Sequence, residues 1–417
     1  MTRTWTAGAA LATITICVLT AALLLLPDQL MVDEHFHHGQ ILFFLAGEFK
    51  RVPEITVTPG YHLLVFAPAA LLGLDQVFSL RAISTALAAS VVMLAWLYWR
   101  HVSAELPLLR ALQLLACPLL WPFYVLLYTD LLALAALLSV VLLADRRHYK
   151  AAAMVGLVAL FIRQTNVFWL ALIWVMAMHQ AGLGAVLLAN HRRPIERLDH
   201  AGRQIWPALK ACWPLALPLV AFVIFVLINR GVAVGDRASH QLGGVYPSQL
   251  FFMLLVLWLV LLPLHLSNLP RIASLVARRI WIAPALLLLG MIYWFSFEVT
   301  HPYNLGLPEF HLRNRVLGWL DGDWRWRLLA FPLMAWTLLS IAASPLRTQS
   351  ALWLFPVTVL AMLPAELIEQ RYYIPPLVLW LLFRQTGSRT VEVSLLIWFA
   401  LLSAAIFAAA SSLRYFL

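Results

Sequence analysis

Two adjacent acids and three histidines follow directly after the first apolar run of the chain. The stretch DEHFHH contains Asp33, Glu34, His35, His37 and His38. Charged side chains beside a bilayer are costly unless they are solvated or paired, so they tend to mark a functional site or an interface. Neighbouring residues of a helix point about 100° apart. One acid can therefore face a cavity while the other caps the helix or forms a salt bridge; the alternative is a helix end with solvated charges.

The same stretch has a spacing that metal ions use. On a helix, His35 and His38 are three residues apart and Glu34 and His38 are four apart, which allows ligation by one face. No HExxH motif and no second ligand cluster accompanies them. We therefore predict that the chain has no metal site.

Further polar islands interrupt the apolar pattern later in the chain. They are RQTN (163–166), GDRASH (235–240), THPYNL (300–305) and ELIEQRYYIPP (366–376). The planar guanidinium groups in these islands suit a phosphate, because they offer bidentate hydrogen bonds. Taken singly, each island is equally well explained as a loop or a buried structural pair. Together on one side of a membrane, they indicate a site for an anionic, sugar-bearing ligand.

Composition defines the scaffold that must position these residues. The 417-residue chain is 63% hydrophobic and only 12% charged, with a mean hydropathy of +0.86, which is too apolar for a water-soluble globule. Apolar runs long enough for helices recur from 5–26 to 391–413. We predict an all-α polytopic membrane protein with about 12 or 13 transmembrane helices and short external loops. No linker or repeat divides the chain, so 1–417 is expected to be a single domain.

The distribution of basic residues predicts the orientation. The segments 190–203 and 271–279 look like cytosolic loops, since short cytosolic loops are rich in Lys and Arg. The loops 27–60, 231–247, 300–326 and 364–371 then face the opposite, external side. The sequence leaves open on which side of the membrane the loops within 79–180 lie.

Other global features point the same way. The net charge of +10 is accounted for by the basic loops, which makes nucleic-acid binding a poor explanation. The three cysteines are isolated in apolar surroundings, so neither a disulfide framework nor a metal site is expected. The first apolar run is long for a signal peptide and is predicted to remain as an uncleaved helix.

Seven motifs together resemble one known family. In order, they are similar to motifs of the dolichyl-phosphate-glucose alpha-1,2-glucosyltransferase family. Members of this family add the terminal glucose to the lipid-linked oligosaccharide of N-glycosylation. The resemblance spans nearly the whole chain. The motifs are DEHFHHGQ (33–40), PEITVTPG (53–60), YTD (128–130), FIRQTNVFW (161–169), VGDRASH (234–240), HPY (301–303) and EQRYYIPP (369–376).

The resemblance implies a GT-C-type multi-helical bundle and an inverting transfer of glucose. The donor would be a polyprenyl-phosphate or dolichyl-phosphate glucose, and the acceptor a hydroxyl of a lipid-linked glycan. The family keeps an essential acid in the first external loop, so Asp33 is the predicted general base and Glu34 the less favoured alternative. A lipid phosphate is an adequate leaving group, so neither a metal nor another cofactor is expected.

The resemblance also suggests roles for the polar islands. Arginine and histidine donors would stabilise the departing phosphate, on which charge accumulates. The candidate donor contacts are Arg163, Gln164, Asn166, Asp236, Arg237, His240, His301, Arg371 and Tyr372, and the candidate acceptor or auxiliary residues are His35, His37, His38, Asp130 and Glu369.

Two alternative functions remain open at the level of sequence. A GT-C transferase for another polyprenyl-phosphate sugar, such as mannose or arabinose, would show the same features. A transporter or lipid flippase would also need polar residues in the membrane, but its inverted repeats are not found. The abundance of arginine over lysine suggests a bacterial inner membrane with the site on the periplasmic face; in a eukaryote it would be the lumenal face of the endoplasmic reticulum.

Overall fold

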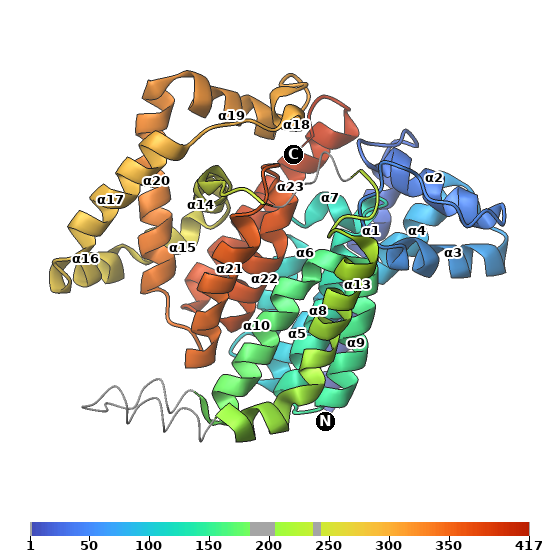
Figure 1. The fold of residues 1–417 in the computed structure, drawn as a ribbon, viewed down its shortest axis with the longest axis horizontal. Coiled ribbons are helices and arrows are strands. Elements are labelled where there is room, and N and C mark those ends of the chain that lie inside the picture. The colour runs from blue at the N-terminus through green and yellow to red at the C-terminus, as the bar shows by residue number, and fades with distance from the viewer. Residues whose placement is uncertain (1, 184–204, 237–242, 417) are drawn as a thin grey trace.

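A computed structural model describes residues 2–183, 205–236 and 243–416. Those residues form an all-helical bundle with no strand, and two isolated bridges join His311 to Phe416 and Leu346 to Arg384. The chain passes back and forth between two ends of the molecule, with the N-terminus at one end and the C-terminus near the other (Figure 1). The prediction of an all-α polytopic membrane protein is confirmed.

The first half of the chain contains the helices that carry the DEHFHH and RQTN motifs. These elements are α1 (Thr2–Leu25), α2 (Glu34–Leu45), α3 (Gly60–Leu72), α4 (Val77–Ala88), α5 (Ser90–His101), α6 (Pro107–Leu115), α7 (Trp121–Val125), α8 (Asp130–Asp145), α9 (Tyr149–Ile162), η1 (Gln164–Asn166), α10 (Val167–Met178) and η2 (His179–Leu183).

The second half begins with a helical stretch at 205–212 that continues into η3. The remaining elements are η3 (Trp213–Ala216), α13 (Leu217–Asn229), α14 (Pro247–Val260), α15 (Leu262–Ser267), α16 (Leu269–Arg278), α17 (Ile282–Ser296), α18 (Pro302–Leu305), α19 (Leu312–Gly322), α20 (Trp324–Ala343), η4 (Gln349–Trp353), α21 (Leu354–Met362), η5 (Gln370–Tyr373), α22 (Ile374–Phe383) and α23 (Arg389–Ser411).

Six helical stretches among the described residues are long and apolar enough to cross a membrane by themselves. A seventh is counted if α16 and α17, which are bent by 106°, form one broken span, and four further apolar helices are shorter. The sequence-based count of about 12 or 13 was higher because it included short and interrupted segments. Polar motifs cause some of these interruptions: Arg163 has an extended backbone (φ −154°, ψ 111°) and separates α9 from η1 and α10.

The α8–α9 hairpin shows at which end of the bundle the turns in the middle of the chain lie. Helix α8 begins at Asp130, and α9 ends one residue before Arg163, with which Asp130 is paired. The turn between the two helices, residues 146–148, therefore lies at the opposite end of the bundle. His101 forms an ion pair with Asp145 there, which brings the end of α5 to the same place.

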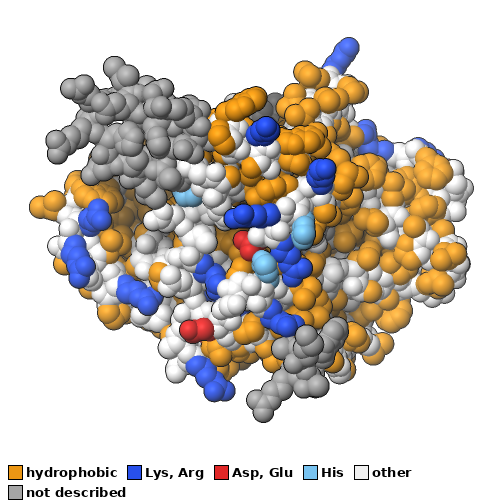
Figure 2. Space-filling model, turned by 90° about the horizontal axis from the view of Figure 1, so that it is seen from below, with side chains coloured by type: hydrophobic (Ala, Val, Ile, Leu, Met, Phe, Trp, Pro, Cys, Tyr) orange, Lys and Arg blue, Asp and Glu red, His pale blue; other side chains and the backbone are white. Residues whose placement is uncertain are grey.

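That opposite end is strongly basic. Figure 2 shows it from below, with Lys and Arg side chains spread over a polar face and few acidic groups. Short cytosolic segments of membrane proteins carry such an excess of positive charge. The basic end is therefore expected to face the cytosol, and the end that contains Asp33 is expected to face outward.

Candidate active site

A cavity of about 360 Å³ lies at the end of the bundle where α2, α7, α18 and α19 meet. All four polar segments that were predicted to be external contribute to its wall, so the structure brings them together. Aromatic and charged side chains both line it. The charged residues that line the cavity are Asp33, Glu54, Arg163, Asp236, Arg313, Glu369 and Arg371.

Asp33 stands at the start of α2 and projects into this cavity. Its backbone N–H donates a hydrogen bond to the Tyr128 hydroxyl (3.2 Å), and its carboxylate is 2.8 Å from Nη1 of Arg371. The Asp33 side chain is 33% exposed, so the carboxylate remains reachable from the cavity. Burial, with the nearby charge of Asp33, raises the pKa of Tyr128 well above its ordinary value, so the hydroxyl that anchors Asp33 stays protonated.

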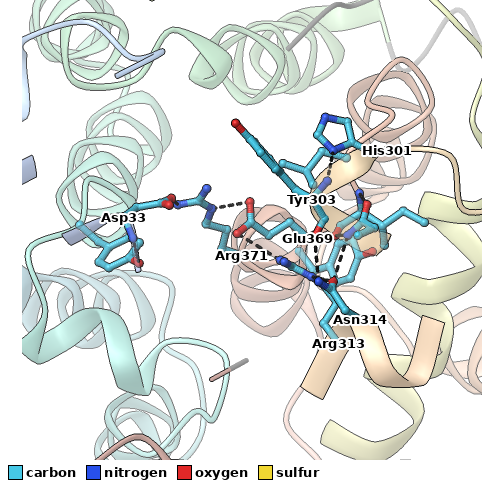
Figure 3. Close-up of polar contacts among 12 residues, drawn as sticks. Asp33, His301, Tyr303, Arg313, Asn314, Glu369 and Arg371 are labelled. Carbon is cyan, nitrogen blue, oxygen red and sulfur yellow. Dashed lines mark hydrogen bonds and ion pairs between the residues drawn. The ribbon is translucent and has the colours of Figure 1, made fainter. Parts of the chain in front are cut away.

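Arg371 connects Asp33 to a chain of charges. Its Nε is 2.6 Å from one oxygen of Glu369, and the other oxygen of Glu369 is 3.3 Å from Nη1 of Arg313. Figure 3 shows the Arg371 guanidinium between the two carboxylates. Asn314 extends this chain, because its side chain accepts a hydrogen bond from Arg313 and donates to the carbonyl of Tyr303. Three segments far apart in sequence thus hold one guanidinium beside Asp33.

A second arginine lies across the same cavity. Arg163 pairs with Asp130 at the start of α8 and is also 3.4 Å from the hydroxyl of Thr129. Its guanidinium lies over the ring of Tyr372, 5.9 Å from the centroid. Arg163, Arg371 and Tyr372 also line a smaller adjoining cavity of about 150 Å³. The two arginines therefore offer donors to the same volume.

The two amides of RQTN serve the backbone. Gln164 accepts a hydrogen bond from the N–H of Thr58 and donates to the carbonyls of Thr56 (2.6 Å) and Val232 (3.2 Å). Asn166 donates to backbone carbonyls of α8 and α9. Both residues line the smaller cavity; the Gln164 amide binds the backbone of two loops, and the Asn166 Nδ2 binds α8 and α9. Their contact with the donor stays a prediction.

Glu34 has a different environment from its neighbour Asp33. It is fully buried, and its carboxylate receives two hydrogen bonds of 2.7 Å from Arg81 in α4. The backbone N–H groups of Met31 and Leu127 donate to the same carboxylate. Arg81 also donates to two carbonyls of the loop before Asp33. Glu34 is thus fully engaged in fixing this loop and does not reach the cavity, which leaves Asp33 as the candidate base.

The three histidines of the first motif also differ in whether they line the cavity. His37 is buried, lines the cavity, and lies 2.9 Å from His62 through its Nδ1. Burial, aided by Arg371 and Arg163, lowers the pKa of His37 to about 3, so the ring is neutral. His35 is exposed, and neither His35 nor His38 lines the cavity.

The remaining predicted site residues differ in where the structure places them. His301 is buried and caps α18, since its Nδ1 accepts the N–H of Tyr303 (3.2 Å). Asp236 lines the cavity. Arg237 and His240 lie outside the described residues. Within the described ranges, no group of three or more His, Cys, Asp and Glu side chains is arranged to hold a metal ion.

Sequence reasoning missed three residues that shape the site. Arg313 and Tyr128 line the cavity, and Arg81 supports it from behind. Arg81 had a signal that could have been used, because a lone cation inside an apolar helix needs a buried anion as partner. Arg313 lay within an arginine-containing segment, FHLRNR, but nothing in its spacing pointed to Glu369.

The model of the DIE2/ALG10 family matches residues 27–382, which include Asp33, Arg163, Glu369 and Arg371. The chain belongs to the DIE2/ALG10 family. This result confirms the resemblance drawn from the motifs.

Curated relatives of this DIE2/ALG10 member share one name, Dol-P-Glc:Glc(2)Man(9)GlcNAc(2)-PP-Dol alpha-1,2-glucosyltransferase. The protein from Arabidopsis thaliana is 26% identical, with 89% of each chain covered. The protein from Mus musculus is 25% identical, covering 87% of this chain and 86% of its own. The protein from Drosophila melanogaster is 27% identical, covering 84% and 82%. No solved structure matches this chain.

Proposed function

We propose that this protein is an inverting, membrane-embedded glucosyltransferase that uses a polyprenyl-phosphate or dolichyl-phosphate glucose as donor and a hydroxyl of a lipid-linked glycan as acceptor. The names of its relatives support the donor and the acceptor. The observation that carries the proposal is the partly exposed carboxylate of Asp33, 2.8 Å from Arg371 in a cavity that also contains Arg163.

Asp33 acts as the general base of this reaction. An acceptor hydroxyl that enters the cavity gives its proton to the Asp33 carboxylate as its oxygen forms a bond to C1 of the glucose. The bond between C1 and the phosphate oxygen breaks, and its electron pair leaves with the phosphate. Attack opposite to the leaving group inverts C1, which converts a β-linked donor into an α-linked product, in keeping with the alpha-1,2 linkage in the relatives' names.

Arg371 and Arg163 stabilise the departing phosphate. Donors that are fixed before the reaction act most strongly where charge develops in the transition state. Glu369 holds Arg371 from the far side and Asp130 holds Arg163, so both guanidinium groups are positioned without the donor. The glycan of the acceptor approaches past exposed Tyr303 and Glu54 at the outer wall of the cavity.

The proposal is tested by reconstituting the purified protein with radiolabelled donors. Glucose is expected to move from dolichyl-phosphate glucose, but not from UDP-glucose, to a lipid-linked oligosaccharide that ends in glucose. The product should resist an enzyme specific for β-linked glucose. Transfer from dolichyl-phosphate mannose alone would contradict the assigned sugar, and transfer from UDP-glucose alone would contradict the lipid donor.

A further inference from the structure

A second, larger cavity opens beside the candidate active site. It has a volume of about 630 Å³ and lies between α14, α19 and α23, with the segment between α6 and α7 behind it. Its wall is apolar along most of its length. The polar residues of the wall include Arg313 and Arg315 of α19 and Gln370 of η5, and this part of the wall is its polar end.

Two helices, α14 and α23, form the long walls of this groove, and their lining residues have similar spacing. The lining residues of α23 run from Leu402 to Ala410 at spacings of i, i+3, i+4, i+7 and i+8, and those of α14 run from Phe252 to Val260 at the same spacings with Trp258 added. Such spacing places them on one helix face over two turns, about 12 Å along the axis. The groove is therefore elongated along α23, which is long and apolar enough to cross the membrane, and along the shorter apolar helix α14.

The polar end of the groove joins the candidate active site. Arg313, Gln370 and Phe416 line both cavities. The side-chain oxygen of Gln370 is buried and has no hydrogen-bond partner among the described residues. A buried acceptor without a partner is uncommon in proteins and points to a ligand group or a water molecule at that position. Gln370 directly precedes Arg371 in the chain, so the junction lies next to the guanidinium that faces Asp33.

We propose that this groove binds the polyprenyl chain of the sugar donor. The inference rests on the proposed function, and its reason is the covalent structure of the donor. One phosphate separates the reacting carbon from the first isoprenoid unit, so the chain must leave the active site close to Arg371. In the acceptor, the glycan separates the reacting hydroxyl from its lipid, so that lipid needs no apolar wall at this distance.

Two other cavities are less suitable for the chain. The cavity beside RQTN shares Arg163 and Arg371 with the active site but has a volume of only about 150 Å³. A cavity of about 490 Å³ between α14, α20, α21 and α22 is also apolar, yet it shares no lining residue with the active site. Of these three cavities, the groove between α14 and α23 is the one that combines length, apolar walls and a junction with the active site.

The test compares donors with long and short chains. Ala409→Trp narrows the groove, and Ala361→Trp makes the same change in the cavity beside RQTN. For Ala409→Trp, the KM of a long-chain polyprenyl-phosphate glucose should rise about tenfold, as expected when about two methylene groups lose their apolar contacts. The KM of citronellyl-phosphate glucose, which has only two isoprenoid units, should change little. Ala361→Trp should leave the ratio of the two KM values as in the wild type.

The opposite pattern, in which Ala361→Trp alone raises the ratio, overturns the inference. Crosslinking provides a measurement that needs no glucose transfer: a polyprenyl phosphate with a diazirine at its second isoprenoid unit is photolysed with the wild-type protein. Labelled peptides within 252–260 or 402–410 support the groove, and labelling confined to α10 and α21 contradicts it. If the wild type labels in the groove but transfers no sugar from any donor, the proposed function fails and the lipid site stands.

Discussion

Each end of the bundle contains an arginine–carboxylate cluster; one cluster opens into a cavity and the other is buried. At one end, Arg371 lies between Asp33 and Glu369, and the carboxylate of Asp33 opens into a cavity. At the other end, Arg384 makes two hydrogen bonds of 2.7 and 2.6 Å with Glu392. That second pair is closed off, since both side chains are almost fully buried.

The difference lies in how completely each acid is satisfied. The Glu392 carboxylate also accepts hydrogen bonds from Gln113 (2.8 Å) and from the N–H of Gly387 (2.7 Å), so it ties α6, α22 and α23 together. The Asp33 carboxylate has one ion pair and a third of its side chain exposed. A buried ion pair is therefore not by itself a sign of catalysis; an acid that remains accessible beside fixed cations is a better one.

The largest effect is expected at Asp33. Asp33→Asn keeps the shape of the side chain but cannot accept a proton at neutral pH, so kcat should fall by about 10²- to 10⁴-fold, or about 3–5 kcal/mol of activation free energy. Transfer of radiolabelled glucose measures the rate, and the thermal unfolding temperature should stay near that of the wild type. Glu48→Gln removes an exposed acid outside the cavity and serves as the control. A variant that keeps more than about a tenth of the wild-type rate would rule out Asp33 as the base.

A substitution in the buried Arg384–Glu392 pair should lower the stability of the protein rather than its activity. Glu392→Ala leaves Arg384 buried without its partner, which is expected to lower the free energy of unfolding by about 3–5 kcal/mol. Chemical denaturation in detergent measures this loss. The rate per folded molecule should match the wild type, because the pair lies at the far end of the bundle. Glu48→Ala, which breaks an exposed pair with Lys50, should lower stability by less than about 1 kcal/mol. Equal losses in the two variants would contradict the distinction.

A smaller effect is expected at Arg371. Arg371→Lys keeps the charge but loses the planar fork that contacts Asp33 and Glu369 together, so the KM of the donor should rise about tenfold. Saturation curves for the lipid-linked donor measure this change. Arg327→Lys, on a partly exposed pair with Asp321 that lines neither the catalytic cavity nor the groove beside it, is the matched substitution and should have little effect. Unchanged donor KM in Arg371→Lys would mean that Arg371 serves the fold alone.

His37 offers a test through pH. Its folded pKa of about 3 lies below the ordinary value of 6.5, so the unfolded chain binds more protons between these values. Its contribution to stability is therefore complete above pH 6.5 and is lost as the pH falls, by at most about 1.4 kcal/mol per pH unit. His37→Gln should flatten the decline of the thermal unfolding temperature between pH 7 and pH 5. His62, Tyr61 and Tyr128, which pack against the ring, remain in place. An unaltered decline would assign the effect to other groups.

The last prediction concerns orientation and is measured by chemical labelling, without an activity assay. Cysteine introduced at Tyr303, on the site end, should react with an impermeant reagent from outside sealed cells or from the lumen of vesicles. Cysteine at Arg146, on the basic end, should react only after the membrane is opened. Both positions are exposed, and Cys17 is replaced beforehand because it is the exposed native cysteine among the described residues. Labelling of both positions from one side would exclude the proposed separation of the two ends.

The fold class could be predicted because hydropathy alone determines whether a helix is stable in lipid. The number of spans was harder, since many helices are short or broken. In α3, for example, the chain forms only 13 residues of helix and contains Pro68, although its sequence is apolar from Leu63 onward. Apolar composition indicates that a segment lies in or near the membrane, but it does not indicate whether the segment crosses.

The site could be predicted only in part for a similar reason. Asp33, Arg163 and Arg371 were identified because charges are rare in an apolar chain, and the structure places all three in one cavity. Gln164 and His301 were equally conspicuous, yet their polar atoms bind the backbone. The type of a residue shows that a polar group needs a partner; only the tertiary structure shows whether the partner is protein or substrate.

The pair between Glu34 and Arg81 has a consequence for biosynthesis. Arg81 lies inside a 25-residue apolar stretch, Val77–His101, and a cation there opposes transfer of the segment into lipid. Glu34 is translated before Arg81, so its carboxylate is already at the membrane when this segment leaves the ribosome. Glu34 thus provides the counterion with which the second long apolar stretch can enter the bilayer.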